Sequence, residues 1–236
     1  MYKWHAIIKR ISNVRDKIGI ERVKGCFMNK RIYRRAIALA LPLLIFAGLY
    51  YPLFGYAILL CMVLAIITSL YNGRYWCGQL CPRGLFFDEF LNVISSKNKI
   101  PAFFKSLSFK LIWLLILMSV MAIQFVLSKG DVYLFGRGLL MILIVTTVIG
   151  ILLGIYYKAR IWCVFCPIGT MCGWLGRNRK PINIEGANCI NCNICLKNCP
   201  MDIHAGEYKN LGRVVVGDCT KCGNCINVCP KNALSL

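Results

Sequence analysis

The chain has 236 residues, of which 58% are hydrophobic and only 16% charged, whereas soluble domains average about 45–50% apolar and about 25% charged residues. This composition excludes an ordinary soluble domain and predicts a membrane protein. The 29 Lys and Arg residues outnumber the 9 Asp and Glu residues, so nucleic acid, anionic lipid and acidic proteins must all be considered as partners. The positions of the charges decide between them.

The N-terminal segment, residues 1–35, is predicted to be basic and amphipathic. Apolar residues recur at helical spacing through residues 1–24, with basic residues on the opposite face. A helix lying on the membrane surface and a solvated helix that docks on a partner are equally compatible with this pattern. The segment lacks the continuous apolar stretch of a cleavable signal peptide.

A first pair of membrane helices is predicted between Arg35 and Arg74, where no residue is charged. This uncharged run is about twice the roughly 20 residues that one helix needs to cross the hydrocarbon core. A tight turn near Gly48 to Pro52 is expected to divide the two helices, because proline interrupts a helix and tyrosines suit the membrane interface.

A second pair follows, with uncharged spans at Leu111 to Ser128 and Gly138 to Tyr157. The short loop expected between these spans contains Lys129, Asp131 and Arg137. Residues 36–175 are therefore predicted to be an α-helical membrane domain of four transmembrane helices, arranged as two hairpins.

Charge asymmetry predicts the orientation. Basic residues crowd the N-terminal segment, the stretch from Arg74 to Lys110 and the stretch from Lys158 to Lys180, while the two opposite turns carry almost none. We therefore expect a multi-pass protein of the cell inner (cytoplasmic) membrane with both termini on the cytoplasmic side. Since membrane orientation accounts for the positive charge, nucleic acid is not expected as a partner.

An internal repeat joins the two hairpins. The sequence Arg74-Tyr-Trp-Cys77, followed by Cys81-Pro82 and Gly84, recurs as Arg160-Ile-Trp-Cys163, followed by Cys166-Pro167 and Gly169. Each copy follows a hairpin, so the two halves are expected to be related and to build a site at their interface. The copies differ in the gap between their cysteines, which is three residues in the first and two in the second.

The 15 cysteines are mostly clustered. Twelve of them stand at gaps of two or three residues, which is the spacing of metal ligands rather than of a disulfide framework. The last segment, residues 180–236, is polar and rich in Asn, Gly and Cys, and its apolar runs are too short to span a bilayer. A soluble domain this small buries little apolar surface, so bound metal clusters are expected to stabilise it.

Two cysteine motifs of the form C-x2-C-x2-C-x3-C-P fill this C-terminal domain. Three closely spaced thiolates bind three irons of one cubane, and the proline-marked fourth cysteine reaches the other cluster. Zinc also accepts four cysteines, but zinc sites rarely use a doubled, proline-closed pattern. The expected ligand sets are Cys189, Cys192, Cys195 and Cys229 for one cluster, and Cys219, Cys222, Cys225 and Cys199 for the other.

The C-terminal domain resembles bacterial ferredoxins with two [4Fe–4S] clusters. This resemblance implies a small α+β, ferredoxin-like fold with two short helices, and with outer strands at Ile182 to Ile184 and Leu234 to Leu236. The membrane part resembles the NapH-like family of membrane ferredoxins, together with the NosR, YccM and CcoG types. The matching residues are Cys77, Cys81-Pro82, Cys163 and Cys166-Pro167.

The four cysteines of the membrane part allow two interpretations. They can supply thiolates to a further iron–sulfur centre or a redox dithiol at the membrane edge, or they can be small buried residues that close the helix ends. Arg74, Trp76, Arg160 and Trp162 lie beside them, where either a site or interfacial snorkelling and anchoring explains their presence. No role is assigned to Cys26, Cys61, Cys172, His5 or His204.

The family resemblance implies an electron-transfer protein that passes electrons between the membrane, through quinol, and a partner oxidoreductase or ferredoxin-type protein. A subunit of a quinol dehydrogenase fits this better than a stand-alone enzyme. A metal-reducing maturation factor of the CcoG type and a passive membrane tether for a ferredoxin domain are the alternatives. The tether predicts that the four membrane-part cysteines are dispensable.

Overall fold

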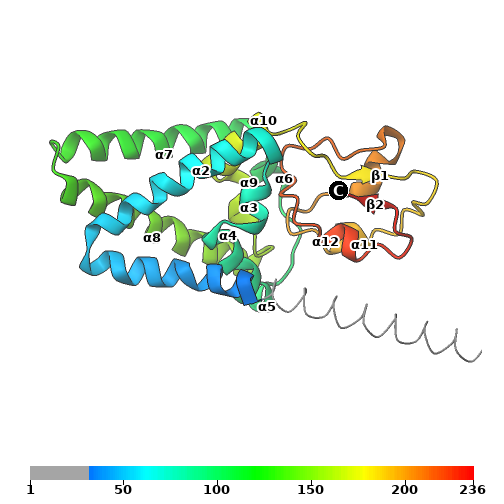
Figure 1. Cartoon of the computed structure of the whole chain (residues 1–236), viewed down its shortest axis with the longest axis horizontal. Helices are drawn as coiled ribbons and strands as arrows, with labels where there is room; N and C mark the ends of the chain where they lie inside the picture. The colour runs from blue at the N-terminus through cyan, green and yellow to red at the C-terminus, as the bar shows by residue number, and fades with distance from the viewer. Residues whose placement is uncertain (1–31) are drawn as a thin grey trace, which may run out of the picture. The chain divides into compact units, whose positions relative to one another are not determined.

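The computed structural model describes residues 32–236 (Figure 1). Residues 37–236 form one compact unit. Among the described residues, four helical stretches are long and apolar enough to cross a membrane: Ile32–Tyr50, Pro52–Asn72, Leu107–Leu127 and Val132–Tyr156. The prediction of four such helices is confirmed. The predicted amphipathic pattern within residues 1–24 lies outside the described residues.

The turn of the first hairpin is where the sequence predicts it. The first helix ends at Tyr50, and Pro52 begins the 3-10 helix η1 (Pro52–Tyr56), which leads into α2 (Ala57–Asn72). Proline suits this first position because its missing N–H would have no helical acceptor there.

The second hairpin differs from the prediction at its turn. α7 covers Leu107–Leu127 and α8 covers Val132–Tyr156, so Arg137 lies within α8 and not in the loop. The reason is the cap: the Asp131 carboxylate accepts hydrogen bonds from the backbone N–H groups of Tyr133 at 2.8 Å and Leu134 at 3.3 Å. The turn between α7 and α8 lies at the opposite end of these helices from α3 and α9 (Figure 1).

Each hairpin is followed by a pair of short helices, as the sequence repeat predicts. α3 (Tyr75–Gln79) and α4 (Pro82–Phe86) follow the first hairpin, and α9 (Ile161–Phe165) and α10 (Pro167–Leu175) follow the second. Cys81 and Cys166 occupy the N-cap positions of α4 and α10. The chain between α4 and α7 forms the π-helix η2 (Phe87–Leu91) and two short helices, α5 (Asn92–Ile94) and α6 (Ala102–Lys105).

An aromatic core lies where the two copies of the repeat meet. Phe87, Trp162 and Phe165 are fully or almost fully buried. Trp113 of α7 packs against Trp162 with ring centroids 6.0 Å apart and planes at 82°. Such edge-to-face contacts fix both the distance and the orientation of the packed helices. The short helices that carry the repeated cysteines are therefore rigidly placed.

Residues 180–236, here called the ferredoxin segment, contain little regular structure. β1 (Asn183–Ile184) pairs antiparallel with β2 (Leu234–Ser235), close to the positions predicted for the outer strands. The helical pieces are α11 (Ile194–Lys197), the 3-10 helix η3 (Ala205–Leu211) and α12 (Asn224–Asn227). Its own core cluster consists of Ile182, Ile184, Ala205, Val214 and Leu234.

Candidate functional site

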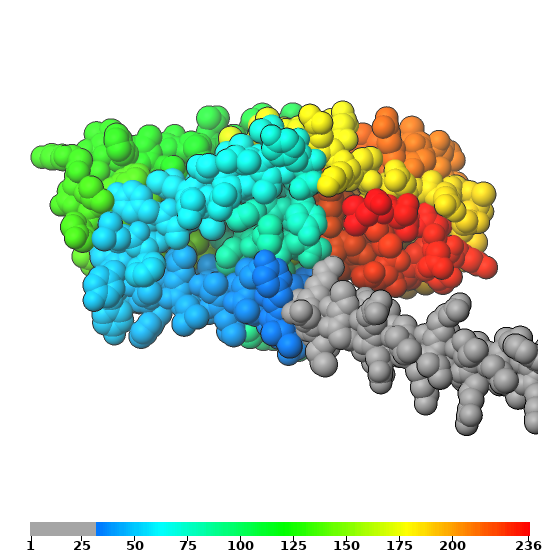
Figure 2. Space-filling view, in the orientation of Figure 1, coloured from blue at the N-terminus to red at the C-terminus, as the bar shows by residue number. Residues whose placement is uncertain are grey.

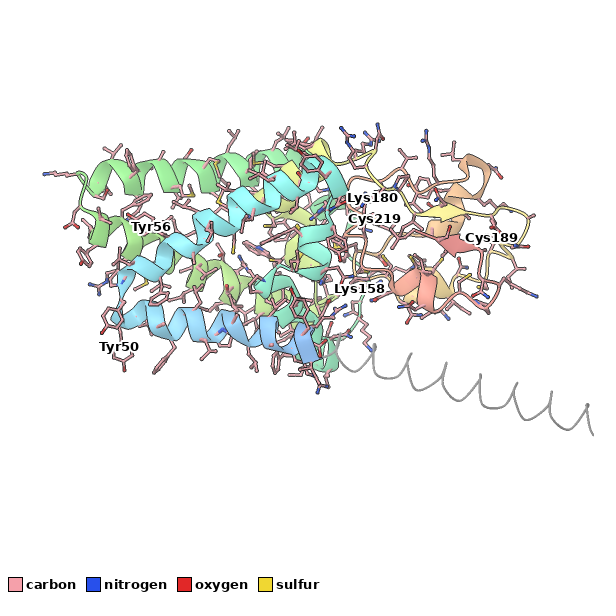
Figure 3. All side chains as sticks on the ribbon, viewed as in Figure 1. Tyr50, Tyr56, Lys158, Lys180, Cys189 and Cys219 are labelled. Carbon is pink, nitrogen blue, oxygen red and sulfur yellow. The ribbon has the colours of Figure 1, made fainter. Side chains whose placement is uncertain are left out.

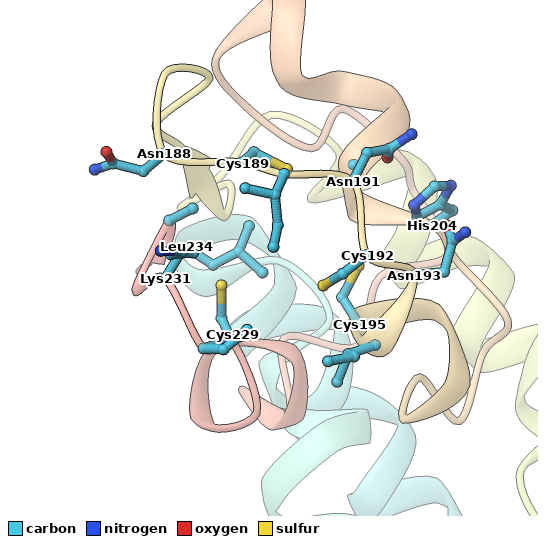
Figure 4. A pocket seen from close by; sticks show the side chains of 15 residues that line it. Asn188, Cys189, Asn191, Cys192, Asn193, Cys195, His204, Cys229, Lys231 and Leu234 are labelled. Carbon is cyan, nitrogen blue, oxygen red and sulfur yellow. The ribbon is translucent and has the colours of Figure 1, made fainter.

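Cys189, Cys192, Cys195 and Cys229 surround one cavity of about 410 Å³ in the ferredoxin segment. Figure 4 shows their sulfur atoms facing the same space: Cys189 and Cys192 come from the loop that leads into α11, Cys195 from α11 itself, and Cys229 from the loop after α12. We call this space the distal cavity. Apolar side chains, among them Ile190 and Leu234, complete its walls.

A second cavity of about 410 Å³ is lined by Cys199, Cys219, Cys222 and Cys225. We call it the proximal cavity, because the loop that carries Cys222 contacts α3: the Gln79 side-chain amide donates to the Cys222 carbonyl at 3.1 Å. In Figure 3, Cys219 lies next to the helical bundle and Cys189 lies farther from it.

The donor set and the shape of both cavities fit a [4Fe–4S] cubane. Each cavity draws three cysteines from one motif and the fourth from the other, as the doubled motif predicts. Within residues 32–236, no group of three or more His, Cys, Asp or Glu side chains is gathered closely enough to hold a single metal ion. A cubane does not need its four ligands to meet at one metal ion, because each cysteine binds a different iron of the cluster.

The two cavities differ in their surroundings. Cys192 of the distal cavity is exposed, and the neighbouring Ile190 is 60% exposed. In the proximal cavity, burial raises the pKa of Cys225 to about 12 and that of Cys219 to about 11. Iron binds thiolates, so cluster binding has to displace protons there, and it couples tightly to folding.

The ferredoxin segment is held against the short helices by ion pairs at Asp202. Lys158 donates to the Asp202 carboxylate at 2.8 Å and to the Cys199 carbonyl at 2.9 Å, and Lys105 lies 3.4 Å from the same carboxylate. Burial raises the pKa of Asp202, but the hydrogen bond from Lys158 and the two lysine charges outweigh it and lower the pKa overall. Asp202 therefore stays ionised near neutral pH.

Asp218 makes the second set of ion pairs, directly before Cys219 in the chain. Lys110 of α7 lies 2.7 Å from the Asp218 carboxylate, and Arg74 lies 3.4 Å from it. Figure 2 shows the C-terminal part of the chain packed closely against the segment that contains α3. The proximal cavity is thus tied to the membrane part through residues adjacent to its own cysteines.

The four cysteines of the repeat, which we call the membrane-edge cysteines, also lie near one another. Cys77 and Cys163 are buried, and Cys81 and Cys166 are half-buried. Burial and, to a smaller extent, the charges of the other three cysteines raise the pKa of Cys81 to about 12. A hydrogen bond with Cys172 lowers the pKa of Cys77 to about 6, helped by Arg74 and opposed by burial. The four thiols are therefore close enough to influence one another electrostatically.

Two arginines cross-link the halves of the repeat in a reciprocal way. Arg74 of the first half donates to the Cys163 carbonyl at 2.6 Å, and Arg160 of the second half donates to the Cys77 carbonyl at 2.8 Å. Arg160 also makes a two-point ion pair with Asp88, with both N–O distances 2.6 Å. Both arginines are at most 1% exposed. The snorkelling interpretation is therefore wrong for these arginines.

The repeated glycines have a physical reason in this arrangement. A Cβ on Gly169 would collide with the Arg74 guanidinium, and a Cβ on Gly84 would lie 3.7 Å from that of Arg160 and 3.0 Å from the Cys77 carbonyl oxygen. Gly169 thus makes room for the arginine of the other half, whereas the tight approach at Gly84 is to the Cys77 carbonyl of its own half. The sequence repeat signals this pairing, although its geometry could not be read from the sequence.

Several residues in and around the site were not singled out by sequence. Cys172, which we left without a role, lies beside Cys77 and its thiol donates to the Ala65 carbonyl at 3.4 Å. His204 is not isolated either, since it lines the distal cavity and lies 3.4 Å from Glu207. Asp88 and Asp218 carry no motif. Their only signal is that acidic residues are so scarce in this chain.

Replacing Arg160 with glutamine is expected to destabilise the protein by about 3–5 kcal/mol, because removing one partner of a buried ion pair leaves its neighbours poorly compensated. Thermal unfolding in detergent measures the loss. Arg177→Gln is the matched control, since Arg177 is exposed. Equal unfolding temperatures for the two variants would show that the cross-link contributes no stability.

Comparison with known proteins assigns both cysteine-rich regions. The family described as "4Fe-4S binding domain" matches residues 54–101 and 139–184, which include the four membrane-edge cysteines. The family described as "4Fe-4S dicluster domain" matches residues 188–234, which include the eight cysteines of the two cavities. No solved structure matches the chain.

Relatives extend over most of the chain. An uncharacterized protein of Methanocaldococcus jannaschii is 26% identical over 207 residues, covering 81% of this chain and 80% of the relative. The putative electron transport protein YccM of Escherichia coli is 27% identical over 197 residues, or 74% of this chain and 54% of YccM. The ferredoxin-type protein NapH of Haemophilus influenzae is 24% identical over 189 residues, or 71% of this chain and 63% of NapH. With its two 4Fe-4S regions, its cysteine motifs and its four apolar helices, the chain is similar to the NapH- and YccM-type 4Fe-4S proteins, and these matches support a function in iron–sulfur electron transport.

Proposed function

We propose that the protein carries electrons from quinol in the membrane to a soluble partner oxidoreductase through a chain of iron–sulfur centres. The observation that carries this proposal is the continuous connection from the membrane-edge cysteines to the proximal cavity. Arg74 donates to the Cys163 carbonyl and pairs with Asp218, which directly precedes Cys219. Gln79, two residues after Cys77, donates to the Cys222 carbonyl.

In this proposal, the ferredoxin segment holds two [4Fe–4S] clusters. The proximal cluster is bound by Cys199, Cys219, Cys222 and Cys225, and the distal cluster by Cys189, Cys192, Cys195 and Cys229. The common cavity of each set supports the assignment. When bound, such clusters supply one-electron redox chemistry. The polypeptide supplies the thiolates, the apolar walls and the contact with the membrane part.

The membrane-edge cysteines Cys77, Cys81, Cys163 and Cys166 are proposed to form a further redox centre, either an iron–sulfur centre or a dithiol. Their mutual electrostatic influence and the match of this region to a 4Fe-4S binding family support it. The passive-tether alternative gives no reason for these thiols to converge from two halves of a repeat. An experiment on the redox centre must therefore distinguish it from a passive tether.

A cavity of about 460 Å³ next to this centre is the proposed place for the quinol head group. Lys110, in the first turn of the membrane helix α7, lines it together with Thr170, Trp174 and Asp218. The Thr170 hydroxyl is buried and has no hydrogen-bond partner among the described residues. Arg177 also lines the cavity, so its wall offers two cations, the Asp218 carboxylate and the unpartnered Thr170 hydroxyl to the hydroxyl groups of a quinol.

The partner is proposed to dock at the distal cavity. Cys192 is exposed there, and Ile190 presents an apolar side chain to solvent beside it. An exposed cluster ligand beside an apolar contact suits a partner that must come close to accept an electron. Electrons would then leave from the end of the chain of centres that is farther from α3.

The quadruple replacement of Cys77, Cys81, Cys163 and Cys166 by serine tests the proposal. Quinol is expected to reduce the two ferredoxin clusters in the natural protein but not in this variant. Dithionite should reduce them in both, because it needs no membrane-edge centre. Absorbance bleaching under each reductant is the measurement. Normal quinol-driven bleaching in the variant would favour the tether.

We also propose that both termini and the ferredoxin segment face the cytoplasm, as the charge asymmetry predicts. A cysteine introduced at the exposed Lys129 is expected to react with an impermeant maleimide in intact spheroplasts. A cysteine at the equally exposed Lys99 should react only after lysis. The unaltered chain gives the background from native cysteines. Labelling of Lys99→Cys and protection of Lys129→Cys would reverse the topology.

A further inference from the structure

A third arginine near the membrane-edge cysteines differs from Arg74 and Arg160 in having no acidic partner. Arg83 follows Pro82 in α4, and its guanidinium lies over the Trp162 ring, 4.3 Å from the centroid. One terminal nitrogen donates to the backbone carbonyl of Thr146, within the membrane helix α8. The buried Nε of Arg83 has no acceptor. Part of the hydrogen-bonding capacity of this cation is therefore unused.

The charge of Arg83 needs a counter-charge. No ion pair joins it to a carboxylate within residues 32–236, whereas Arg74 pairs with Asp218 and Arg160 pairs with Asp88. A half-buried cation without a counter-charge is costly. Three of the membrane-edge cysteines, Cys166, Cys163 and Cys81, act electrostatically on Arg83, and they would carry negative charge as thiolate ligands of a bound centre.

The repeat shows that the local fold does not need this cation. In the second copy the residue between proline and glycine is Ile168, and α10 begins there in the same way as α4 begins at Pro82. The start of the helix, the cysteine at its N-cap and the close contact at the glycine therefore do not require a charged residue at this position. Arg83 is thus a charged residue beside the cysteines of the first half that has no counterpart in the second half.

We infer that Arg83 is the counter-charge of the centre held by the membrane-edge cysteines and raises its reduction potential. The inference rests on the proposed function, which assigns a redox centre to Cys77, Cys81, Cys163 and Cys166. A cation beside such a centre stabilises the state that carries the additional electron. The contact with Trp162 and the Thr146 carbonyl holds the guanidinium in place without neutralising it. The centre would thereby accept electrons from a membrane donor more readily.

The test is a redox titration followed by paramagnetic resonance on the full-length protein in detergent. Arg83→Gln is expected to reduce the equilibrium constant for one-electron reduction of the membrane-edge centre about tenfold, or about 59 mV. Arg83→Lys should stay close to the natural value, because it keeps the charge. The potentials of the two ferredoxin clusters serve as internal controls and should not move. Arg179→Gln controls for the loss of an exposed positive charge, because Arg179 does not line the proposed quinol cavity.

Ile168→Arg keeps the inference falsifiable if Arg83→Gln does not fold, because a second cation is expected to raise the potential of the same centre. Unchanged potentials in both charge variants would make Arg83 a structural residue. The proposed function fails in a different way. In that case the natural protein itself would show no signal beyond the two ferredoxin clusters, and quinol would still reduce those clusters after the quadruple serine replacement, whatever residue stands at position 83.

Discussion

Replacing Gly78 with valine is expected to separate the ferredoxin segment from the short helices while leaving its clusters in place. Gly78 lies in α3, directly after Cys77, and a Cβ there would collide with the backbone carbonyl oxygen of Thr220. A backbone atom in a loop between two cluster ligands cannot move aside as a flexible side chain would. Overpacking of this kind costs about 1–3 kcal/mol, which is enough to open a small interface.

The measurements for Gly78→Val are quinol-driven cluster reduction and limited proteolysis of the full-length protein. We expect quinol-driven reduction to be lost, dithionite reduction to be kept, and cleavage between α10 and the ferredoxin segment to increase. Gly130→Ala is the matched control: it strains a glycine with φ +85° in an exposed turn but meets no atom within 4 Å. If quinol reduced the clusters of Gly78→Val as fast as those of the natural protein, this contact would not be part of the electron path.

Removal of the clusters is expected to unfold the ferredoxin segment and leave the membrane helices folded. A core cluster of five buried apolar residues and a sheet of two-residue strands cannot offset the conformational entropy of more than 50 residues. Cluster binding therefore supplies most of the free energy of folding here, as in small metal-dependent domains. Cys222→Ser and Cys192→Ser should each lose a cluster and destabilise the segment.

Iron chelation of the full-length protein followed by proteolysis measures this dependence. The ferredoxin segment should be digested, while helical circular dichroism from the membrane part persists. Cys61→Ser is the matched control, because Cys61 lies in α2 and stands at no ligand spacing. A protease-resistant ferredoxin segment without iron would contradict the prediction.

The sequence was sufficient for the features that rest on periodicity and spacing. One uncharged run long enough for two crossings and two uncharged spans of about one crossing each predict four membrane helices, and the described part of the chain has four helices of this kind. The doubled ferredoxin motif predicts that each set of four cysteines takes three members from one motif and its proline-marked member from the other. The cavities around Cys229 and Cys199 have this composition.

Features that depend on helix capping or on contacts distant in the chain could not be predicted. The helix start at Val132 depends on the Asp131 cap, which a hydropathy window does not detect. The burial of Arg74 and Arg160 depends on carbonyl and carboxylate partners in the other half of the repeat or in the ferredoxin segment. A charged residue at a membrane edge resembles a snorkelling residue until these partners are known.

The most direct test of the central claim is the iron and labile sulfide content of the purified protein, measured beside that of the quadruple serine variant of the membrane-edge cysteines. Two [4Fe–4S] clusters account for about eight iron atoms per chain. If the membrane-edge cysteines hold an iron–sulfur centre, the natural protein contains more than this, and the variant loses only the excess. About eight iron atoms in both proteins, with equal quinol-driven reduction, would contradict a redox centre at the membrane edge.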